Sequence, residues 1–249
     1  MITIMDAADL REFYSSRLGT VTRRLLSLRL RRHWPSVNGC AVLGLGFALP
    51  YLDLFRAESE RVFGFMPARR GVMHWPQDGP SATALVGDTE LPLLDGSLDR
   101  VLCIHSLELA DDPASLLREV WRVLTPQGRA LIVTPNRRGM WARFDSTPFG
   151  YGQPYSRPQL QALLKDADFM PAAWSQALFI PPFSGSLILS SATAIERAGS
   201  WTSPAFSGVI LVEAIKQVYA VSGGKRQRRL AYRLRPAPVL QSQERPRPR

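Results

Sequence analysis

The segment VLGLGFALPY, residues 42–51, combines residue types that can bind a nucleotide through the protein backbone. Its first two residues are typical of the end of a buried strand, Gly44 and Gly46 of a tight turn, and Pro50 of the first position of a helix. Backbone N–H groups at such a strand–turn–helix junction can bind a nucleotide. The segment has no third glycine and no acidic residue, so a working site, a modified site and a relic all remain open.

Three titratable side chains lie at or just after the ends of predicted strands: Asp88, His105 and Glu108. An imidazole can accept a proton near neutral pH, so His105 is a candidate general base, although a hydrogen-bonded histidine at a strand end would look the same. Asp88 is a candidate ligand-binding acid, and its alternative role is that of an ordinary turn residue. We expect Glu108 to lie near a helix start, where an acid is favourable, and assign it no catalytic role.

The cysteines and histidines show no metal-binding pattern. Cys40 and Cys103 lie far apart without a C-x-x-C motif, and we expect them to be reduced thiols. His33, His74 and His105 are equally scattered. The sequence therefore predicts no metal site.

The hydropathy pattern predicts a cytoplasmic protein without an integral membrane segment. No apolar run reaches the roughly 18–20 residues that a membrane-spanning helix needs. The first residues, MITIMDAADLREFY, include early acids and lack the apolar core of a secretory signal.

Basic charge is concentrated at the end of the chain. Residues 223–249 carry nine lysine or arginine side chains and one glutamate, and so account for eight of the ten net positive charges. We expect this Arg/Pro-rich tail to be disordered. It could bind an acidic protein, a nucleic acid or an acidic membrane surface, or act only as a solvated end that aids solubility.

The remaining chain divides into a helical N-terminal segment, residues 1–38, and a larger domain, residues 39–222. Between residues 6 and 32, leucines and other apolar residues recur at helical spacing among arginines, which predicts an amphipathic helix on a core or at a membrane surface. The larger domain alternates apolar strands with helices, and its strands are continuous apolar runs, which predicts an α/β fold with a covered parallel sheet. The predicted strands are 39–46, 61–66, 83–88, 100–106, 129–136, 172–180 and 207–220, and the main helices are 50–60, 112–124, 156–169 and 185–199.

The segment GDTELPLLDGSLDRVLCIHSLELADDPASLLREVWRVLTPQGRALIVTPN, residues 87–136, resembles the middle of a class I S-adenosylmethionine-dependent methyltransferase of the type 11 branch. The resemblance covers about residues 39–180. It implies a Rossmann-like, seven-stranded, mostly parallel sheet with helices on both faces. It also implies S-adenosylmethionine as cofactor, bound over the carboxyl ends of the strands, as is general for open α/β sheets.

The resemblance assigns a place at the cofactor to eight residues and a possible catalytic place to His105. The glycine turn would face the methionine end of the cofactor, the end of the second strand its ribose, and the residues after the third strand its adenine. The fourth strand would open beneath the sulfonium. The cofactor residues are Gly44, Gly46, Ala48, Met66, Asp88, Thr89, Glu90 and Ile104.

Several positions depart from the family pattern. Gly44 stands where the family has an acid, two residues before the first turn glycine, and Met66 stands where the family has the ribose-binding acid. Ala48 and Pro50 stand where the family has its second and third glycines. A hydrogen bond to a charged group contributes about 1.5–3 kcal/mol, so two uncompensated losses predict binding weaker by about 10² to 10⁴.

A long connection, residues 137–156, follows the fifth predicted strand and is a candidate lid over the methyl acceptor. The residues that we expect to bind the acceptor are Arg137, Trp141, Arg143, Tyr151 and Tyr155. Cations and flat apolar surfaces suit an aromatic or acidic small molecule, although an ordinary packed loop would look the same. We therefore expect a methyltransferase with a small-molecule substrate, or else an inactive methyltransferase fold with a binding or regulatory role. A nucleic-acid methyltransferase is a third hypothesis, and the segment IHSLEL lacks the motif of base-amino methylation.

Overall fold

A computed structural model describes residues 6–87, 89–202 and 206–218 of the chain. Residues 1–218 belong to one compact unit, and Tyr219–Arg249 form a separate unit that lies outside the described residues. The predicted basic tail, residues 223–249, falls in that second unit, and Asp88 also lies outside the described residues.

Seven strands form one sheet in the order β3-β2-β1-β4-β5-β7-β6. The strands are β1 (Ala41–Gly46), β2 (Arg61–Pro67), β3 (Thr83–Val86), β4 (Leu98–Ile104), β5 (Leu124–Pro135), β6 (Phe169–Ala177) and β7 (Val209–Lys216). The five strands β1 to β5 are parallel to one another in the sheet, whereas β7 runs antiparallel to both β5 and β6. The predicted α/β fold with a seven-stranded, mostly parallel sheet is therefore confirmed.

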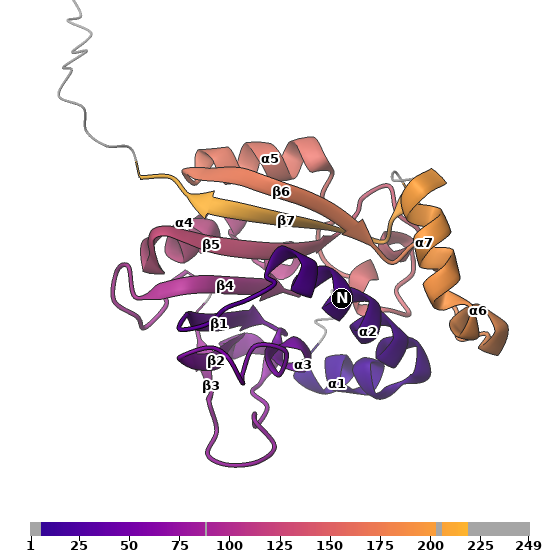
Figure 1. Ribbon diagram of the computed structural model, residues 1–249, viewed down its shortest axis with the longest axis horizontal. Helices are drawn as coiled ribbons and strands as arrows, with labels where there is room; N and C mark the ends of the chain where they lie inside the picture. The colour runs from indigo at the N-terminus through magenta and orange to yellow at the C-terminus, as the bar shows by residue number, and fades with distance from the viewer. Residues whose placement is uncertain (1–5, 88, 203–205, 219–249) are drawn as a thin grey trace, which may run out of the picture. The chain divides into compact units, whose positions relative to one another are not determined.

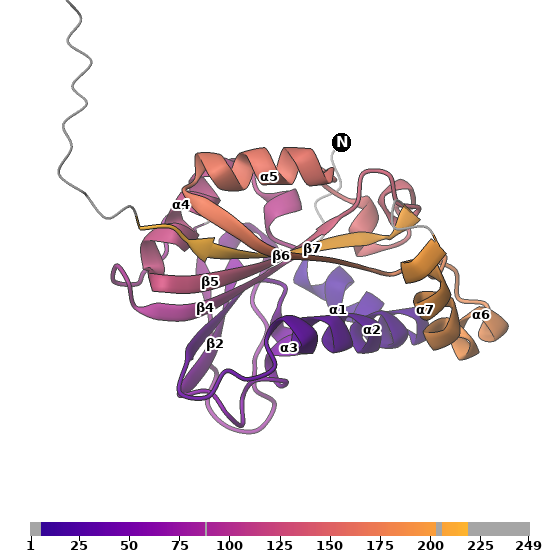
Figure 2. The ribbon, with the colours of Figure 1, turned by 45° about the horizontal axis from the view of Figure 1, so that its top comes forward.

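Helices cover both faces of the sheet (Figures 1 and 2). Helices α1 (Ala7–Ser15), α2 (Arg17–His33) and α3 (Leu49–Leu52) lie on one face, and α4 (Pro113–Val123) and α5 (Arg157–Asp166) on the other. Helices α6 (Ser186–Ser190) and α7 (Ala192–Thr202) contribute to the core on the α1–α3 side. Successive strand residues point to opposite faces, so Val42 packs in the α1–α3 core and Leu43 in the α4–α5 core.

The N-terminal segment consists of two helices where the sequence predicted a single helical stretch. Ser16 separates α1 from α2, because its backbone is extended, and its side-chain oxygen accepts a hydrogen bond from the N–H of Gly19. Both helices pack on the sheet through buried leucines such as Leu10 and Leu26. None of the helices in the described residues is long and apolar enough to cross a membrane.

The helix predicted at 50–60 is much shorter in the structure. After α3, the backbone N–H groups of Leu54 and Phe55 bond to carbonyls three residues earlier, so the chain continues as tight turns. These turns bring Tyr51, Leu52 and Phe55 together into the core. By contrast, α4 begins as predicted, since the Asp112 carboxylate accepts a hydrogen bond from Ser115 N–H at 3.0 Å.

Candidate active site

The carboxyl ends of β1 and β4 approach each other closely at the glycine turn. Gly46 lies beside Ile104 in the parallel register, and the N–H of Phe47 donates to the Ile104 carbonyl oxygen at 2.8 Å. Gly46 has φ +83°, and a Cβ at this position would collide with that same carbonyl. A glycine is therefore required here by the protein's own packing.

Gly44 has a different role, because it lies within β1 under helix α3. A Cβ at this position would lie 2.8 Å from a methyl group of Leu52 and 3.0 Å from the Cβ of Ala48. The family's acid at this position would meet the same side chains. The absence of the family's acid at residue 44 is thus consistent with the close packing of α3 on β1.

The other cofactor residues that the resemblance names divide into a buried and an exposed group. Ala48, Met66 and Ile104 are each at most 1% exposed and belong to the core on the α1–α3 side. Thr89 and Glu90 are exposed after β3. Asp88, which precedes them, lies outside the described residues, so its predicted contact with adenine stays a prediction.

A buried chain of polar side chains, here called the His105 cluster, consists of Tyr14, Tyr51, His105 and Glu108. The Tyr14 hydroxyl lies 2.8 Å from His105 Nε2, and the Tyr51 hydroxyl donates to the Tyr14 oxygen at 3.1 Å. His105 itself has φ +50°, an uncommon backbone conformation for a residue other than glycine. Such conformations occur often at functional sites, so this one supports a role for the imidazole.

Glu108 lies on the other side of the imidazole. Its Oε1 is 3.3 Å from His105 Nδ1, and neither side chain is more than 1% exposed. That contact is within ion-pair distance, but Nδ1 and both Glu108 oxygens make no hydrogen bond of good geometry in the described part of the chain. Glu108 lies in the first turn of a short 3₁₀ helix, Leu107–Leu109, that precedes α4, and it is buried.

Burial and the charge of Glu108 both raise the pKa values of the neighbouring Cys103 thiol and Tyr155 hydroxyl. Desolvation is the main cause that raises the pKa of Cys103 to about 12, and the Glu108 carboxylate adds to it. The same two causes raise the pKa of Tyr155 to about 12. Burial, next to the Tyr51 hydroxyl, holds the pKa of Tyr14 well above its usual value, so Tyr14 is a neutral phenol.

Aromatic rings enclose the His105 cluster. Tyr14 stacks on Phe47 at 5.7 Å between ring centroids and meets the ring of Tyr51 edge-on at 5.9 Å. Phe149 lies over His105 at 4.7 Å. The cluster is thus a polar chain within an apolar shell.

The structure divides the five residues predicted to bind the acceptor. Trp141 and Tyr155 are buried: the indole N–H of Trp141 donates to the Ile180 carbonyl at 2.7 Å. Arg137 and Arg143 are exposed, and Tyr151 is half-buried. Two of the five therefore help to build the core, and three remain available to a ligand.

A cleft of about 430 Å³ lies between α1 and the 137–156 connection. Its lining includes the carboxylates of Asp9, Glu12 and Asp145 and the aromatic side chains of Phe13 and Tyr151. Phe13 of this lining packs edge-on against Tyr14 and Phe149, with ring centroids 5.2 and 6.4 Å away, so the cleft adjoins the aromatic rings around the His105 cluster.

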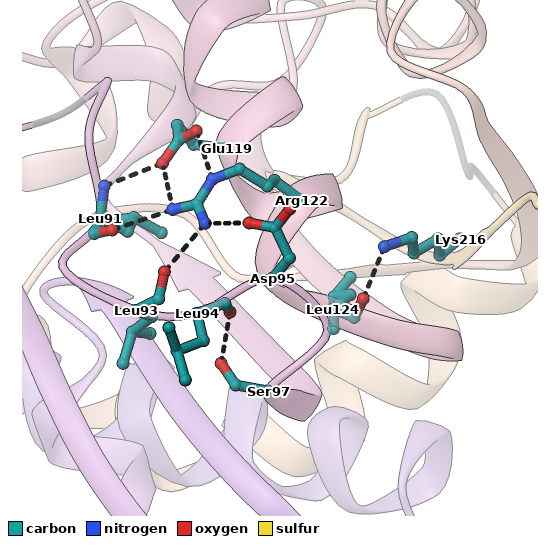
Figure 3. A network of polar contacts seen from close by, with 9 residues as sticks. All are labelled: Leu91, Leu93, Leu94, Asp95, Ser97, Glu119, Arg122, Leu124 and Lys216. Atoms are coloured by element: carbon teal, nitrogen blue, oxygen red, sulfur yellow. Dashed lines mark hydrogen bonds and ion pairs between the residues drawn. The ribbon is translucent and has the colours of Figure 1, made fainter.

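A second polar assembly, here called the Arg122 network, joins the chain segment between β3 and β4 to helix α4 (Figure 3). Its members are Leu91, Leu93, Asp95, Glu119 and Arg122. The Arg122 guanidinium donates five hydrogen bonds, to both Glu119 oxygens, to Asp95 and to the carbonyls of Leu91 and Leu93. The Glu119 hydrogen bonds are the main cause that raises the pKa of Arg122 further. This network holds the segment that precedes β4 against α4.

The sequence pattern indicates His105 and Glu108 as candidates but does not pair them with each other or with Tyr14. The His-x-x-Glu spacing was the one available signal for Glu108, because residues three apart lie on the same side of a helical turn. Tyr14 is 91 residues from His105, so no local pattern could connect them. In the described residues, no three His, Cys, Asp or Glu side chains group as metal ligands would.

Comparison with known proteins agrees with the fold and with the resemblance. Residues 41–132 match a family model described as a methyltransferase domain, the type 11 model. A chain from the complex between the Haloferax volcanii Trm112 methyltransferase activator and a protein described as a methyltransferase is 18% identical. The similarity covers 87% of this chain and 100% of that chain, with a TM-score of 0.59.

Two further solved structures share the fold. An S-adenosylmethionine-dependent methyltransferase from Mesorhizobium loti is 16% identical over 76% of this chain and 96% of its own, with a TM-score of 0.54. The cyclase SpnF has the same TM-score, 0.54, at 19% identity over 79% of this chain and 82% of its own. The chain thus has the class I methyltransferase fold, and the predicted resemblance to methyltransferases is confirmed over residues 41–132.

Curated relatives match over a shorter region. The uncharacterized proteins Rv2003c of Mycobacterium tuberculosis and Mb2026c of Mycobacterium bovis are each 26% identical over 164 residues. The match covers 63% of this chain, which spans about half, 55%, of the length of either relative.

Proposed function

We propose that the chain is an S-adenosylmethionine-dependent methyltransferase that acts on a small molecule, with His105 as the general base. The observation that carries this proposal is the position of His105, directly after β4 and beside the glycine turn of β1. Ligands of open α/β sheets bind at the carboxyl ends of the strands, at the point where the strand order reverses direction. An imidazole at that place can take a proton from an acceptor.

The candidate residues would give the adenine end of the cofactor more polar side chains than its ribose or its methionine end. The exposed side chains of Thr89 and Glu90, together with Asp88, would hold the adenine end. Met66 would offer only apolar contact to the ribose, and Gly46 and Ala48 would face the methionine end. Tyr14 stacks on Phe47, the residue that follows the glycine turn, so α1 lies over this part of the site in the structure.

The bound cofactor would supply an electrophilic methyl group, so the chemistry asks little of the side chains. The protein's own contribution is to orient the acceptor, exclude water and remove a proton. The aromatic shell around His105 supports the exclusion of water. Arg137, Arg143 and Tyr151 are the remaining candidates for contact with the acceptor at the protein surface.

A second candidate function is that of a catalytically inactive fold with a binding or regulatory role. The observation that favours it is the burial of the glycine-turn residues: Phe47 and Ala48 are at most 2% exposed. The replaced acids at residues 44 and 66 point the same way. In either case an acidic protein or a nucleic acid remains a possible partner of the basic tail.

Calorimetric titration with S-adenosylhomocysteine tests the proposal. We expect the wild-type protein to bind weakly and Asp88→Ala to bind about 10- to 100-fold more weakly, because an anchoring hydrogen bond to a charged group is lost. The matched control is Glu60→Ala, which removes an exposed acid just before β2 and should leave binding unchanged. Absence of both heat and thermal shift with millimolar ligand would contradict the enzyme proposal and favour the second candidate.

A further inference from the structure

Tyr14 fills a pocket that has the shape of a phenol. Its ring lies flat on Phe47 and meets Tyr51 and His105 edge-on, with centroids 5.9 Å away in both cases. The side chain is 8% exposed, so the surrounding residues enclose it almost completely. These walls would fit any aromatic ring of the same size.

The Tyr14 hydroxyl is bound as specifically as its ring. It accepts a hydrogen bond from Tyr51 and lies within hydrogen-bond distance of His105 Nε2. The Glu108 carboxylate facing Nδ1 favours the tautomer that carries its proton on Nδ1, which leaves Nε2 to accept the Tyr14 proton. The pocket therefore provides one donor and one acceptor for a single hydroxyl group.

The groups that hold this phenol and the phenol itself belong to different parts of the chain. Phe47 and His105 follow the carboxyl ends of β1 and β4, and Tyr51 lies on α3. Tyr14 instead lies on α1, which has nine residues and ends at the extended Ser16. Phe13, which lines the neighbouring cleft, packs edge-on against Tyr14 with ring centroids 5.2 Å apart. Movement of this one helix would empty the pocket and connect it with the cleft.

We infer that Tyr14 occupies the acceptor pocket of this protein, and that the acceptor is a phenol whose hydroxyl takes the place of the Tyr14 hydroxyl between Tyr51 and His105. This inference rests on the proposed function, because only then is the bound hydroxyl a methyl acceptor. The acceptor's O–H proton would pass to His105 Nε2, and the electron pair of that bond would stay on the phenol oxygen. The resulting imidazolium would be stabilised by Glu108.

The test removes the internal phenol and offers an external one. Tyr14→Ala should leave an enclosed hollow, and such hollows bind small aromatic molecules. We expect p-cresol to raise the melting temperature of Tyr14→Ala by about 3 °C or more at ten times its Kd. Toluene, which has the same ring and methyl group without the hydroxyl, should bind at least about tenfold more weakly. Tyr14→Phe keeps the pocket filled and is the matched control, with no shift expected from either ligand.

Each outcome bears on the inference. Equal binding of p-cresol and toluene, or binding of neither, would overturn it, and so would an equal p-cresol shift in Tyr14→Phe. If Tyr14→Ala does not fold, Tyr14→Leu with phenol as the probe makes the same comparison in a smaller hollow. Because p-cresol binding needs no cofactor, a positive shift in a protein that fails to bind S-adenosylhomocysteine would support the phenol pocket while contradicting the proposed function.

Discussion

The Arg122 network and the His105 cluster both join a glutamate to a nitrogen base, but they differ in how well their polar groups are satisfied. Arg122 makes five hydrogen bonds and stands at the partly exposed α4 side of the sheet. Glu108 and His105 are buried, and three of their polar atoms lack a hydrogen bond of good geometry in the described residues.

The difference indicates what each assembly does. A satisfied network stabilises the fold, and its geometry explains why α4 and the segment before β4 stay together. A buried carboxylate without hydrogen bonds instead lowers stability, by about 1–3 kcal/mol or more. Buried polar atoms without partners are rare in proteins, so this cluster is the better candidate for binding a ligand.

The largest effect on stability is expected from Arg122→Met. The substitution removes all five Arg122 hydrogen bonds and leaves Glu119 and the Leu91 carbonyl with one backbone N–H donor each, which should lower the free energy of unfolding by about 2–3 kcal/mol. Urea denaturation measures this change. Arg118→Met, an exposed position on the same helix, is the matched control and should change stability by less than about 0.5 kcal/mol. Equal effects of the two substitutions would show that the Arg122 network does not stabilise the fold.

The Arg122 network also predicts that the stability of the protein depends on pH in the acidic range. The hydrogen bond from Arg122 is the main cause that holds the pKa of Glu119 below its ordinary value of 4.5. A lowered folded-state pKa stabilises the protein above the unfolded-state pKa, and this stabilisation is lost as the pH falls below about 4.5. Wild-type stability should therefore fall more steeply than that of Glu119→Gln between pH 5 and about pH 3. Parallel curves in urea titrations at several pH values would contradict this role.

Glu108→Gln should act in the opposite direction from Arg122→Met. Replacing a buried carboxylate by a neutral group of the same shape should leave the free energy of unfolding unchanged or raise it by about 1 kcal/mol. If the proposed function holds, methyl transfer should fall by about tenfold or more, because His105 loses its orienting charge. A loss of 2 kcal/mol or more in urea denaturation would mean that Glu108 stabilises the fold after all.

The smallest effect is expected outside both polar assemblies. Truncation after Gly223 removes the Arg/Pro-rich segment, whose composition cannot build a core. The melting temperature should stay within about 2–4 °C of the full chain, the shift produced by about 1 kcal/mol. A larger loss would show that the tail packs on the domain.

The sequence predicted the parallel part of the sheet well, because its strands are continuous apolar runs with one strong pattern each. It also predicted the Asp112 cap, where the residue type and the following proline act locally. It failed on helix 50–60, since the length of α3 depends on burying Tyr51 and Phe55 against other elements. Local pattern says little about such packing.

The site was predictable only in part, for a related reason. Gly46 and His105 stand at strand ends, so their places follow from the order of elements. The contacts of Tyr14 with Phe47, Tyr51 and His105 depend on how the N-terminal helix folds back over the sheet. The burial of Trp141 likewise depends on the distant Ile180 carbonyl, so this residue appeared to be a surface candidate in the sequence.

Amide hydrogen exchange with and without S-adenosylhomocysteine tests the central claim most directly, namely that the His105 cluster is a ligand site covered by α1. We expect the ligand to raise exchange about tenfold or more in α1, residues 7–15, and to change it at 105–109. Exchange at 91–97, beside Arg122, should stay the same. Unchanged exchange in α1 while calorimetry shows that the ligand is bound would contradict the account, because the cofactor would then reach its place without moving Tyr14.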